Sequence, residues 1–325
     1  MTEKHIVLED ISPVSLYGVN NGHLQIIKSL FPKLRIAARD NVLRVLGDEE
    51  EMGKFQDSIE GMRRHLLKFN TITEEDILDI IRGNKPQAEA AKDVVVYNIS
   101  GKPIKGRTEN QQKLIDAYAA NDMVFAVGPA GTGKTYLSIA LAVRALKDKV
   151  AKKIILSRPA VEAGEKLGFL PGDMKEKIDP YLQPLYDALE DMIPALKLQE
   201  MMDKHIIQIA PLAFMRGRTL NDAVVILDEA QNTTTAQLKM FLTRMGMNTK
   251  MIVTGDMTQV DLPHDRQSGL RTALAILDGV EGIGFVEMNA KDIVRHRLVT
   301  RIVKAYERFE NRNREKTDTE KTQSK

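Results

Sequence analysis

The sequence predicts an α/β protein in which a mostly parallel sheet is flanked by helices and preceded by a small α+β domain. After residue 107, apolar runs alternate with amphipathic stretches, as expected for buried strands and covering helices. These runs are MVFAVG, KIILSR, HIIQIA, AVVILDE and KMIVTGD. Before residue 107, shorter segments have apolar residues at the spacing of strands and of helices, which predicts a smaller domain.

The composition is that of a folded chain with no strong charge bias. Hydrophobic residues make up 43% and charged residues 28% of 325 residues, with a net charge of +2, so a basic surface would have to be local. The absence of cysteine excludes disulfides, thiolate metal sites and cysteine catalysis. The start MTEKHIVLEDISPV does not resemble a signal peptide and no apolar span reaches membrane length, so we expect a cytoplasmic protein.

Residues 1–84 are expected to form the small N-terminal domain. An amphipathic segment, NGHLQIIKSLF, precedes two alternating stretches, KLRIAAR and VLRVLG, which meet at the turn pair Asp40-Asn41. A long helix follows, because apolar residues recur there at helical spacing: Met52, Phe55, Ile59, Met62 and Leu66. Another helix is expected to begin at Thr73 and to stop at Gly83.

The remaining boundaries follow from polarity and turn residues. Residues 85–107 are interpreted as a linker that contains one candidate edge strand, VVVYNI. Residues 108–310 are expected to form the larger α/β domain. The polar tail, 311–325, has no apolar residue and is expected to be disordered.

The most specific motif is GPAGTGKT, which follows the apolar strand MVFAV and opens an apolar helix. Such a loop turns backbone N–H groups and a helix N-terminus toward phosphate oxygens, whereas a chance glycine-rich turn rarely has this context. Lys134 would reach the β- and γ-phosphates of ATP, and Thr135 would bind Mg²⁺. The nucleotide-binding residues predicted here are Gly128, Pro129, Ala130, Gly131, Thr132, Gly133, Lys134 and Thr135.

Two adjacent carboxylates end the apolar run AVVIL. Phosphoryl transfer to water needs a carboxylate at a strand end to hold the metal and a group to activate the water. Asp228 suits the first role, and Glu229 suits the second as a general base. The alternative is that both acids only cap the helix in TTAQLKMFLTRM, since carboxylates favour helix N-termini.

Together, GPAGTGKT, ILDEAQN and VTGDMTQVDLP resemble motifs I, II and III of superfamily 1 helicases. The intervening SRPAVEAGEKLGFLPGDMKEKIDPYLQPLYDAL and PLAFMRGRTLNDA are similar to the PhoH-like ATPase family, over roughly Arg107 to Tyr306. The resemblance implies a RecA-like P-loop NTPase domain that binds ATP and Mg²⁺, hydrolyses ATP and acts on RNA. It also implies a ring-shaped homo-oligomer such as a hexamer.

Three glutamines acquire roles from this resemblance. Gln111, in RTENQ, resembles the glutamine that reads adenine, although a glutamine on an exposed helix face is the common alternative. Gln231 and Gln259 are similar to the helicase glutamines that sense the γ-phosphate, and the alternative is that both are solvated loop residues.

An arginine is also expected, because a transition-state arginine contributes about 10³ to 10⁵ in rate and can come from a neighbouring subunit. Arg295, in DIVRHRLV, is favoured by the resemblance. Arg244 and Arg266 are the other candidates, and a role as surface arginines is the alternative for all three.

Nucleic-acid contacts are expected from Arg158 in SRP and from Arg216 and Arg218 in MRGRT, with intramolecular ion pairs as the alternative. The N-terminal domain is similar to a KH-type RNA-binding module, with GVNN where that family has GxxG. The second glycine is missing, so an oligomerisation or adaptor domain is the competing interpretation.

The leading functional hypothesis is an RNA helicase or remodelling ATPase. A second is an ATP-gated scaffold for a ribonuclease, because the resemblance associates this family with an endoribonuclease of rRNA maturation. A small-molecule P-loop kinase is a third, which Glu229 disfavours because a water-activating base would waste ATP.

Overall fold

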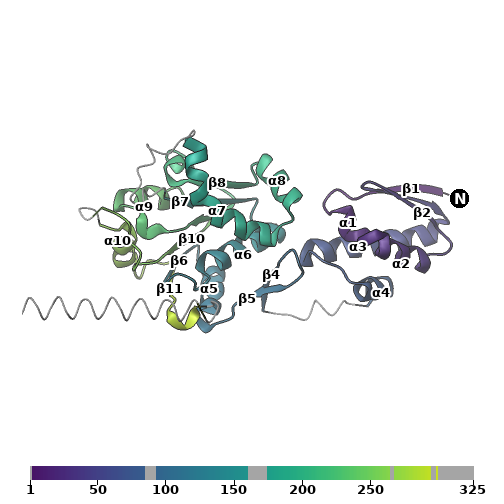
Figure 1. Cartoon of the computed structure of the whole chain (residues 1–325), viewed down its shortest axis with the longest axis horizontal. Helices are drawn as coiled ribbons and strands as arrows, with labels where there is room; N and C mark the ends of the chain where they lie inside the picture. Colours follow the sequence, from purple (N-terminus) through teal and green to yellow (C-terminus); the bar gives the residue numbers. More distant parts are fainter. Residues whose placement is uncertain (1, 85–92, 160–173, 264–266, 294–297, 299–325) are drawn as a thin grey trace, which may run out of the picture.

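The computed structural model describes residues 2–84, 93–159, 174–263, 267–293 and 298. These residues form a six-stranded parallel sheet, a three-stranded antiparallel sheet and a two-stranded hairpin. Figure 1 shows the small sheet with its helices at one end and the larger α/β body at the other. The predicted α/β fold class is confirmed.

The N-terminal unit runs strand, helix, helix, strand, strand, helix, with one further helix behind it. The three strands are antiparallel in the order β1-β3-β2. The first strand was not predicted, because TEKHIV is largely polar. It is almost fully exposed, and pairing with β3 rather than burial stabilises it. The elements are β1 (Thr2–Val7), α1 (Pro13–Tyr17), η1 (Val19–Asn21), α2 (Gly22–Leu30), β2 (Arg35–Arg39), β3 (Val42–Gly47), α3 (Glu49–Phe69) and α4 (Glu74–Ile81).

Helix α3 supplies much of the small core. All five apolar residues that predicted this helix are buried, together with Leu16, Ile27 and Leu43 from its neighbours. Asp48 caps the helix start, and Thr73 caps α4 through a reciprocal hydrogen-bond pair with Asp76, as its position predicted.

The segment interpreted as a linker holds a hairpin of β4 (Val94–Tyr97) and β5 (Pro103–Lys105). The predicted edge strand in VVVYNI is present as β4, which pairs with β5 and with no strand of the large sheet. Val95 and Val96 are buried in the core beside α6. The hairpin therefore belongs to the hydrophobic core of the larger body.

The large sheet has the order β11-β6-β10-β9-β7-β8. Its strands are β6 (Met123–Val127), β7 (Lys153–Arg158), β8 (Ile207–Pro211), β9 (Ala223–Leu227), β10 (Lys250–Gly255) and β11 (Ile283–Glu287). Strand β10 lies between the strand that precedes the phosphate loop, β6, and the strand that precedes the carboxylates, β9. The carboxyl ends of all three therefore meet at one edge of the sheet.

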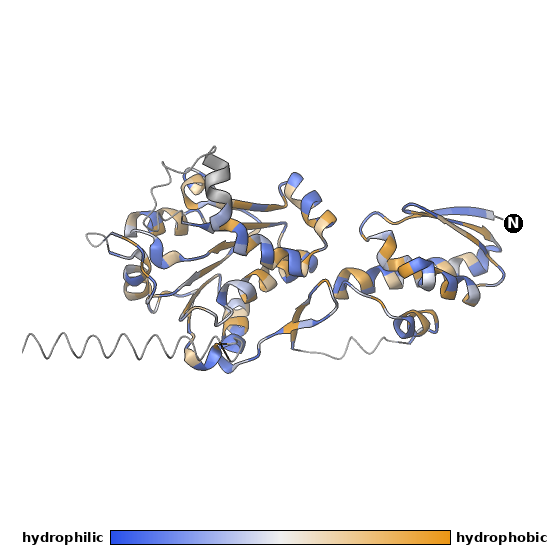
Figure 2. Ribbon diagram, viewed as in Figure 1, coloured by the Kyte–Doolittle hydropathy of each residue, from blue (hydrophilic) through white to orange (hydrophobic). Residues whose placement is uncertain are grey.

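Helices cover both faces of this sheet, so the four inner strands are buried on both sides and carry continuous apolar runs. Figure 2 shows orange residues along the strands and on the inner sides of the helices. The helices are α5 (Glu109–Ala120), α6 (Lys134–Lys147), α7 (Met174–Met192), α8 (Ala195–Asp203), α9 (Thr235–Leu242) and α10 (Gly269–Ile276), with short turns η4 (Leu212–Met215), η5 (Ala230–Asn232) and η6 (Ala290–Asp292).

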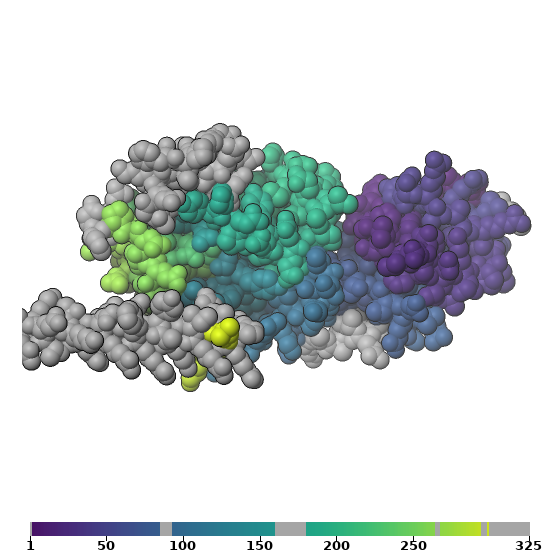
Figure 3. Space-filling view, viewed as in Figure 1, coloured from purple at the N-terminus to yellow at the C-terminus, as the bar shows by residue number. Residues whose placement is uncertain are grey.

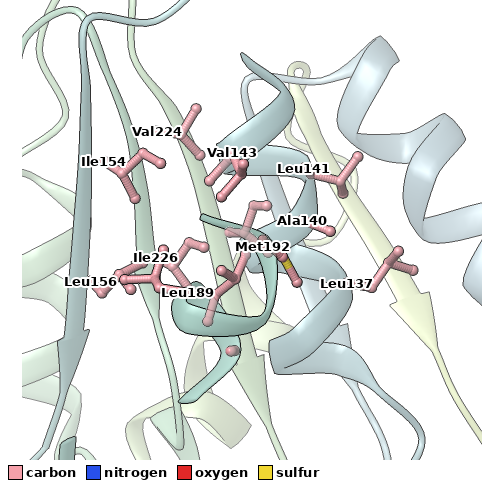
Figure 4. Close-up of a cluster of buried hydrophobic side chains, with 14 of the residues drawn as sticks. Leu137, Ala140, Leu141, Val143, Ile154, Leu156, Leu189, Met192, Val224 and Ile226 are labelled. Atoms are coloured by element: carbon pink, nitrogen blue, oxygen red, sulfur yellow. The ribbon is translucent and has the colours of Figure 1, made fainter. Parts of the chain in front are cut away.

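Alternate strand residues point to the two faces. Ile154 and Ile226 face α6 and α7, whereas Ile155 and Val225 face α9 and α10. Figure 4 shows the first group, where side chains of α6, α7, β7 and β9 interlock. This packing fixes α6, and with it the start of the helix at the phosphate loop.

The N-terminal unit contacts the α/β body at the end of α3, and Figure 3 shows the two as adjoining lobes. The side-chain amide of Asn70 donates to the carbonyls of Tyr97 at 2.7 Å and Met192 at 3.1 Å. Lys147, at the end of α6, donates from Nζ to Asn70 Oδ1 at 2.9 Å. Burial lowers the pKa of Lys147 to about 8.

No helix among the described residues is long and apolar enough to cross a membrane.

Candidate functional site

The predicted phosphate loop connects β6 to α6. Gly133 has φ 82° and directly precedes Lys134, the first residue of α6, so the loop reaches the helix through a left-handed residue. A Cβ on Gly128 would lie 2.3 Å from the Met288 carbonyl oxygen at the end of β11. Glycine at position 128 thus allows the segment that contains Met288 to pack closely against the phosphate loop.

The ammonium group of Lys134 lies inside this loop. Its Nζ donates to the carbonyls of Gly128 at 2.6 Å and Pro129 at 2.8 Å, and the side chain is largely buried. A cation held by the loop's own carbonyls is placed to transfer to phosphate oxygens brought into the same loop.

Asp228 is brought next to the loop as predicted. Thr135 Oγ1, at the start of α6, donates to Asp228 Oδ1, directly after β9, at 2.7 Å. Thr254, at the end of β10, donates to the same oxygen at 2.6 Å. Asp228 is 3% exposed, so these two hydroxyl groups satisfy one oxygen of a buried carboxylate.

Thr254 was not among the predicted site residues. The available signal was its place in VTGD near the end of a predicted strand, and the strand order of the folded sheet brings that strand between the phosphate loop and the carboxylates.

Glu229 adopts a left-handed backbone with φ 55°, an uncommon conformation for a residue with a side chain and one that recurs at functional sites. Its side chain caps no helix. Helix α9 is instead capped by Thr234 and Gln237 through a capping box. The helix-capping alternative for the two acids is therefore contradicted.

Gln231 is completely buried and joins three parts of the site. Its Nε2 donates to Glu229 Oε2 and, at 3.2 Å, to the Gln259 carbonyl. Its Oε1 accepts from the Asp256 backbone N–H at 2.9 Å. The solvated-loop alternative is wrong for Gln231, whereas the Gln259 side chain is exposed and joins the network only through its backbone.

Asp256 is the second residue that the sequence analysis missed. It follows β10 directly and is 4% exposed. Its Oδ2 accepts from the Ala130 N–H at 2.9 Å, while its Oδ1 accepts from the Thr258 backbone and hydroxyl groups. The carboxylate thereby ties the loop after β10 to the phosphate loop.

Gln111 is 6% exposed, so the exposed-helix alternative is wrong. Its Nε2 donates to the Thr132 carbonyl at 2.9 Å, and its Oε1 accepts from the Arg107 backbone N–H at 2.8 Å. It also lines a cavity of about 300 Å³ beside the phosphate loop. The lining residues are Ile104, Lys105, Arg107, Gln111, Gly131, Gly133, Tyr136 and Leu137.

Tyr136 closes one side of this cavity and donates from its hydroxyl group to the Asp191 carboxylate of α7. Burial and the hydrogen bond to Asp191 raise the pKa of Tyr136. The phenol therefore remains a protonated donor near neutral pH.

The donors at Thr135 and Asp228 fit a hard divalent cation such as Mg²⁺, which prefers oxygen ligands and retains phosphate and water ligands of its own. No group of three or more His, Asp or Glu side chains suited to a metal occurs in the part of the chain that the structure describes.

The arginines that were predicted to contact nucleic acid or to act in catalysis do not form one cluster among the described residues. Arg158, expected to contact nucleic acid, instead lies in an intramolecular ion pair with Nη2 3.5 Å from Glu229 Oε1 and Nε 3.9 Å from Asp228 Oδ2. Arg218 donates to Gln208 Oε1 at 2.6 Å, also within the chain. Arg216 is exposed.

Arg244 donates to the carbonyls of Met240 and Arg218, at 3.1 and 3.3 Å. The candidates Arg266 and Arg295 lie outside the described residues, as does the predicted tail at 311–325.

The family profile described as PhoH-like protein matches residues 103–307. A PhoH-like protein of Bacillus subtilis (strain 168) is 48% identical over 301 residues, which cover 91% of this chain and 94% of that protein. A PhoH-like protein of Mycobacterium tuberculosis (strain H37Rv) is 56% identical over 228 residues, 70% of this chain but only 64% of that protein.

Similarity to solved structures is low. A Sulfolobus solfataricus SWI2/SNF2 ATPase core in complex with dsDNA is 15% identical with a TM-score of 0.30, covering 45% of this chain and 30% of that one. The Pif1 helicase from Candida albicans is 13% identical with a TM-score of 0.29, covering 56% of this chain and 40% of that one. Likenesses of this size do not bear on function.

Proposed function

The chain belongs to the PhoH-like protein family of P-loop NTPases, and from that premise we propose that it hydrolyses ATP and acts on RNA, as a helicase or remodelling factor. The observation that carries the proposal is the placement of Glu229. It lies directly after Asp228, the proposed metal-binding carboxylate, and accepts a hydrogen bond from Gln231. The other hydrogen bonds of the Gln231 side chain are to Gln259 and Asp256 in the loop after β10.

Glu229 is the general base in this proposal. The Gln231 amide binds Glu229 Oε2, so the carboxylate keeps one orientation, and its other oxygen, Oε1, would take a proton from water. A base beside the phosphate loop favours transfer to water over transfer to a second substrate, which speaks against the kinase alternative.

Thr135 and Asp228 would hold Mg²⁺, which supplies neutralisation of phosphate charge when it is bound. Thr254 keeps Asp228 oriented by donating to Oδ1, so Oδ2 points away from the two hydroxyl groups. Lys134 would exchange the carbonyls of Gly128 and Pro129 for phosphate oxygens.

The nucleotide base would occupy the cavity beside Gln111. Its volume of about 300 Å³ is at the lower end of small-molecule pockets and suits a purine. Both polar ends of the Gln111 amide are already bonded within the chain, so Gln111 acts here mainly as a brace between Arg107 and the phosphate loop. Adenine selectivity would then depend on the backbone and the other lining groups.

RNA would bind at the carboxyl edge of the sheet. Arg216 and Phe214, which is 61% exposed, flank the end of η4 next to Gly217, whose φ of 75° creates a tight turn. An exposed aromatic ring beside an arginine offers stacking and a phosphate contact together. The N-terminal unit supports the same proposal, because GVNN lies between α1 and α2 in a strand-helix-helix-strand-strand-helix order.

We propose further that the chain assembles as a ring-shaped homo-oligomer such as a hexamer, with an endoribonuclease of rRNA maturation as a partner. Exposed apolar residues from the end of α10 to β11, namely Ile276, Val280 and Phe285, support a subunit contact. Light scattering after size-exclusion chromatography tests the assembly, and a monomer at micromolar concentration would contradict it.

The central test is phosphate release with and without single-stranded RNA. Wild-type protein should release phosphate without any acceptor, and RNA should accelerate the reaction. Glu229→Gln should lower turnover by roughly 10² to 10⁴ while nucleotide binding persists. Glu200→Gln on α8, which removes a carboxylate paired with Lys197 and Lys204, is the matched control and should leave turnover unchanged.

Unchanged turnover in Glu229→Gln would overturn the base assignment, and strict dependence on an acceptor would favour a kinase. A strand-displacement assay on short RNA duplexes separates the remaining alternatives. Displacement that requires ATP indicates a helicase, whereas RNA-stimulated hydrolysis without displacement indicates the ATP-gated scaffold.

A further inference from the structure

Arg158 occupies an unexpected place at the catalytic end of the sheet. It is the last residue of β7, which pairs with β9, so its side chain starts one strand away from Asp228 and Glu229. Its Nη1 donates to the Tyr181 carbonyl of α7 at 3.0 Å. The side chain is 22% exposed, so it is mostly enclosed but not locked in the core.

The two carboxylates each direct one oxygen toward this guanidinium. Asp228 Oδ1 is taken by the two threonine hydroxyl groups, and Glu229 Oε2 is taken by Gln231. Arg158 faces the opposite oxygens, with Nε 3.9 Å from Asp228 Oδ2 and Nη2 3.5 Å from Glu229 Oε1. The guanidinium therefore compensates two adjacent negative charges of which one, Asp228, is buried.

The contacts are long for a permanent ion pair. Charge-assisted hydrogen bonds between arginine and carboxylate measure about 2.7 to 2.9 Å and are often bidentate. Arg158 makes neither kind of contact with the acids, and its close hydrogen bond within the described residues is to a backbone carbonyl. The guanidinium thus lies near the reaction site, and its interactions with the two carboxylates are weak.

We propose that Arg158 is a catalytic arginine supplied in cis: it balances the charges of Asp228 and Glu229 and turns to bind the γ-phosphate of a bound nucleoside triphosphate. The inference rests on the proposed ATP hydrolysis. The phosphate loop delivers the γ-phosphate to the edge where Asp228 and Glu229 lie, and a planar guanidinium binds phosphate oxygens bidentately. Nucleoside diphosphate lacks that group and should not recruit Arg158.

Affinity for two nucleotides measures this role without relying on turnover. Binding of ADP and of the non-hydrolysable triphosphate AMP-PNP, both with Mg²⁺, is followed by displacement of a fluorescent nucleotide from wild type, Arg158→Gln and Arg158→Lys. Arg158→Gln should weaken AMP-PNP binding at least about tenfold and leave ADP binding within about twofold, as for loss of a charged hydrogen bond. Arg158→Lys, which keeps the charge but loses the fork, should fall between.

Turnover should fall in parallel, by about 10³ in Arg158→Gln, which is the lower end for a transition-state arginine. Arg144→Gln is the matched control, since Arg144 pairs with the single carboxylate of Asp148 at the far end of α6. It should leave both affinities and turnover unchanged.

Equal weakening of ADP and AMP-PNP would overturn the proposal, because it would show that Arg158 only supports the fold of the site. Unchanged affinities would overturn it as well. If Arg158→Gln does not fold, Arg158→Lys decides alone, and wild-type ratios of triphosphate to diphosphate affinity in that variant contradict the proposal. Wild-type protein that binds no ATP would instead refute the proposed function itself.

Discussion

The carboxylate of Asp256 accepts a hydrogen bond from the backbone N–H of Ala130, with 2.9 Å between Asp256 Oδ2 and the nitrogen. Its own backbone N–H donates to Gln231, which in turn binds Glu229. One residue at the end of β10 therefore touches both the phosphate loop and the network that holds the proposed base. This arrangement gives nucleotide binding a direct connection to the loop after β10.

Asp256→Ala should weaken nucleotide binding. The change leaves the Ala130 N–H and the Thr258 donors without their acceptor, and an unsatisfied buried group costs about 1 to 3 kcal/mol, which corresponds to roughly five- to 150-fold in affinity. Titration with a fluorescent ADP measures the loss. Asp256→Asn retains one accepting oxygen and should lose less, so equal losses in both variants would contradict this explanation.

Thr254→Val should raise the Mg²⁺ concentration that half-saturates ATP hydrolysis by about 10- to 100-fold, as for other residues that orient a metal ligand. Valine has nearly the same shape but cannot donate to Asp228 Oδ1. A Mg²⁺ titration at fixed ATP concentration gives the value. Thr254→Ser keeps the hydroxyl group and should resemble wild type, whereas a Val variant with wild-type Mg²⁺ dependence would exclude this role for Thr254.

Gln231→Glu should reduce turnover by more than about tenfold and abolish stimulation by RNA. The substitution places a second carboxylate against Glu229 and removes the donor to the Gln259 carbonyl, and like charges in a buried site repel strongly. Phosphate release with and without RNA gives both quantities. Gln199→Glu is the control, because Gln199 also donates to a carboxylate, that of Asp203, but on an exposed helix. Normal RNA stimulation in Gln231→Glu would disprove the coupling.

Lys147 should make stability depend on pH where α3 meets α6. Its pKa is lowered to about 8 by burial, from an ordinary value of 10.5. Between these two values the unfolded chain binds one more proton at this site than the folded chain does, so the free energy of unfolding rises with pH by up to about 1.4 kcal/mol per unit. Below pH 8 the ammonium is charged in both states, and the burial penalty is fully present.

The Lys147→Met variant has no titratable group at this position. Denaturant unfolding of both proteins from pH 7 to 10.5 should therefore show the variant's relative stability falling as the pH rises through 8. A constant difference between the two proteins across that range would mean that Lys147 is not titrating as its burial implies.

The site residues that local motifs predicted are those whose role can be recognised from their immediate neighbours in the sequence. GPAGTGKT was recognisable from the strand before it and the helix after it. Asp228 and Glu229 were recognisable from the apolar run that precedes them. Helix α3 followed from the spacing of its apolar residues. Strand β1 was not predictable in this way, since its polar residues are stabilised by pairing with β3 across some forty positions of chain.

The sequence by itself determined the α/β class, the phosphate loop, the carboxylate pair and the family, because each depends on residues that are contiguous in the chain. Only the tertiary structure decided that β10 lies between β6 and β9, which brings Thr254 and Asp256 into the site, and that Arg158 faces the carboxylates. The physical reason is that strand order in a parallel sheet is set by packing between distant segments. A residue's partners at a strand end depend on which strand lies next to it.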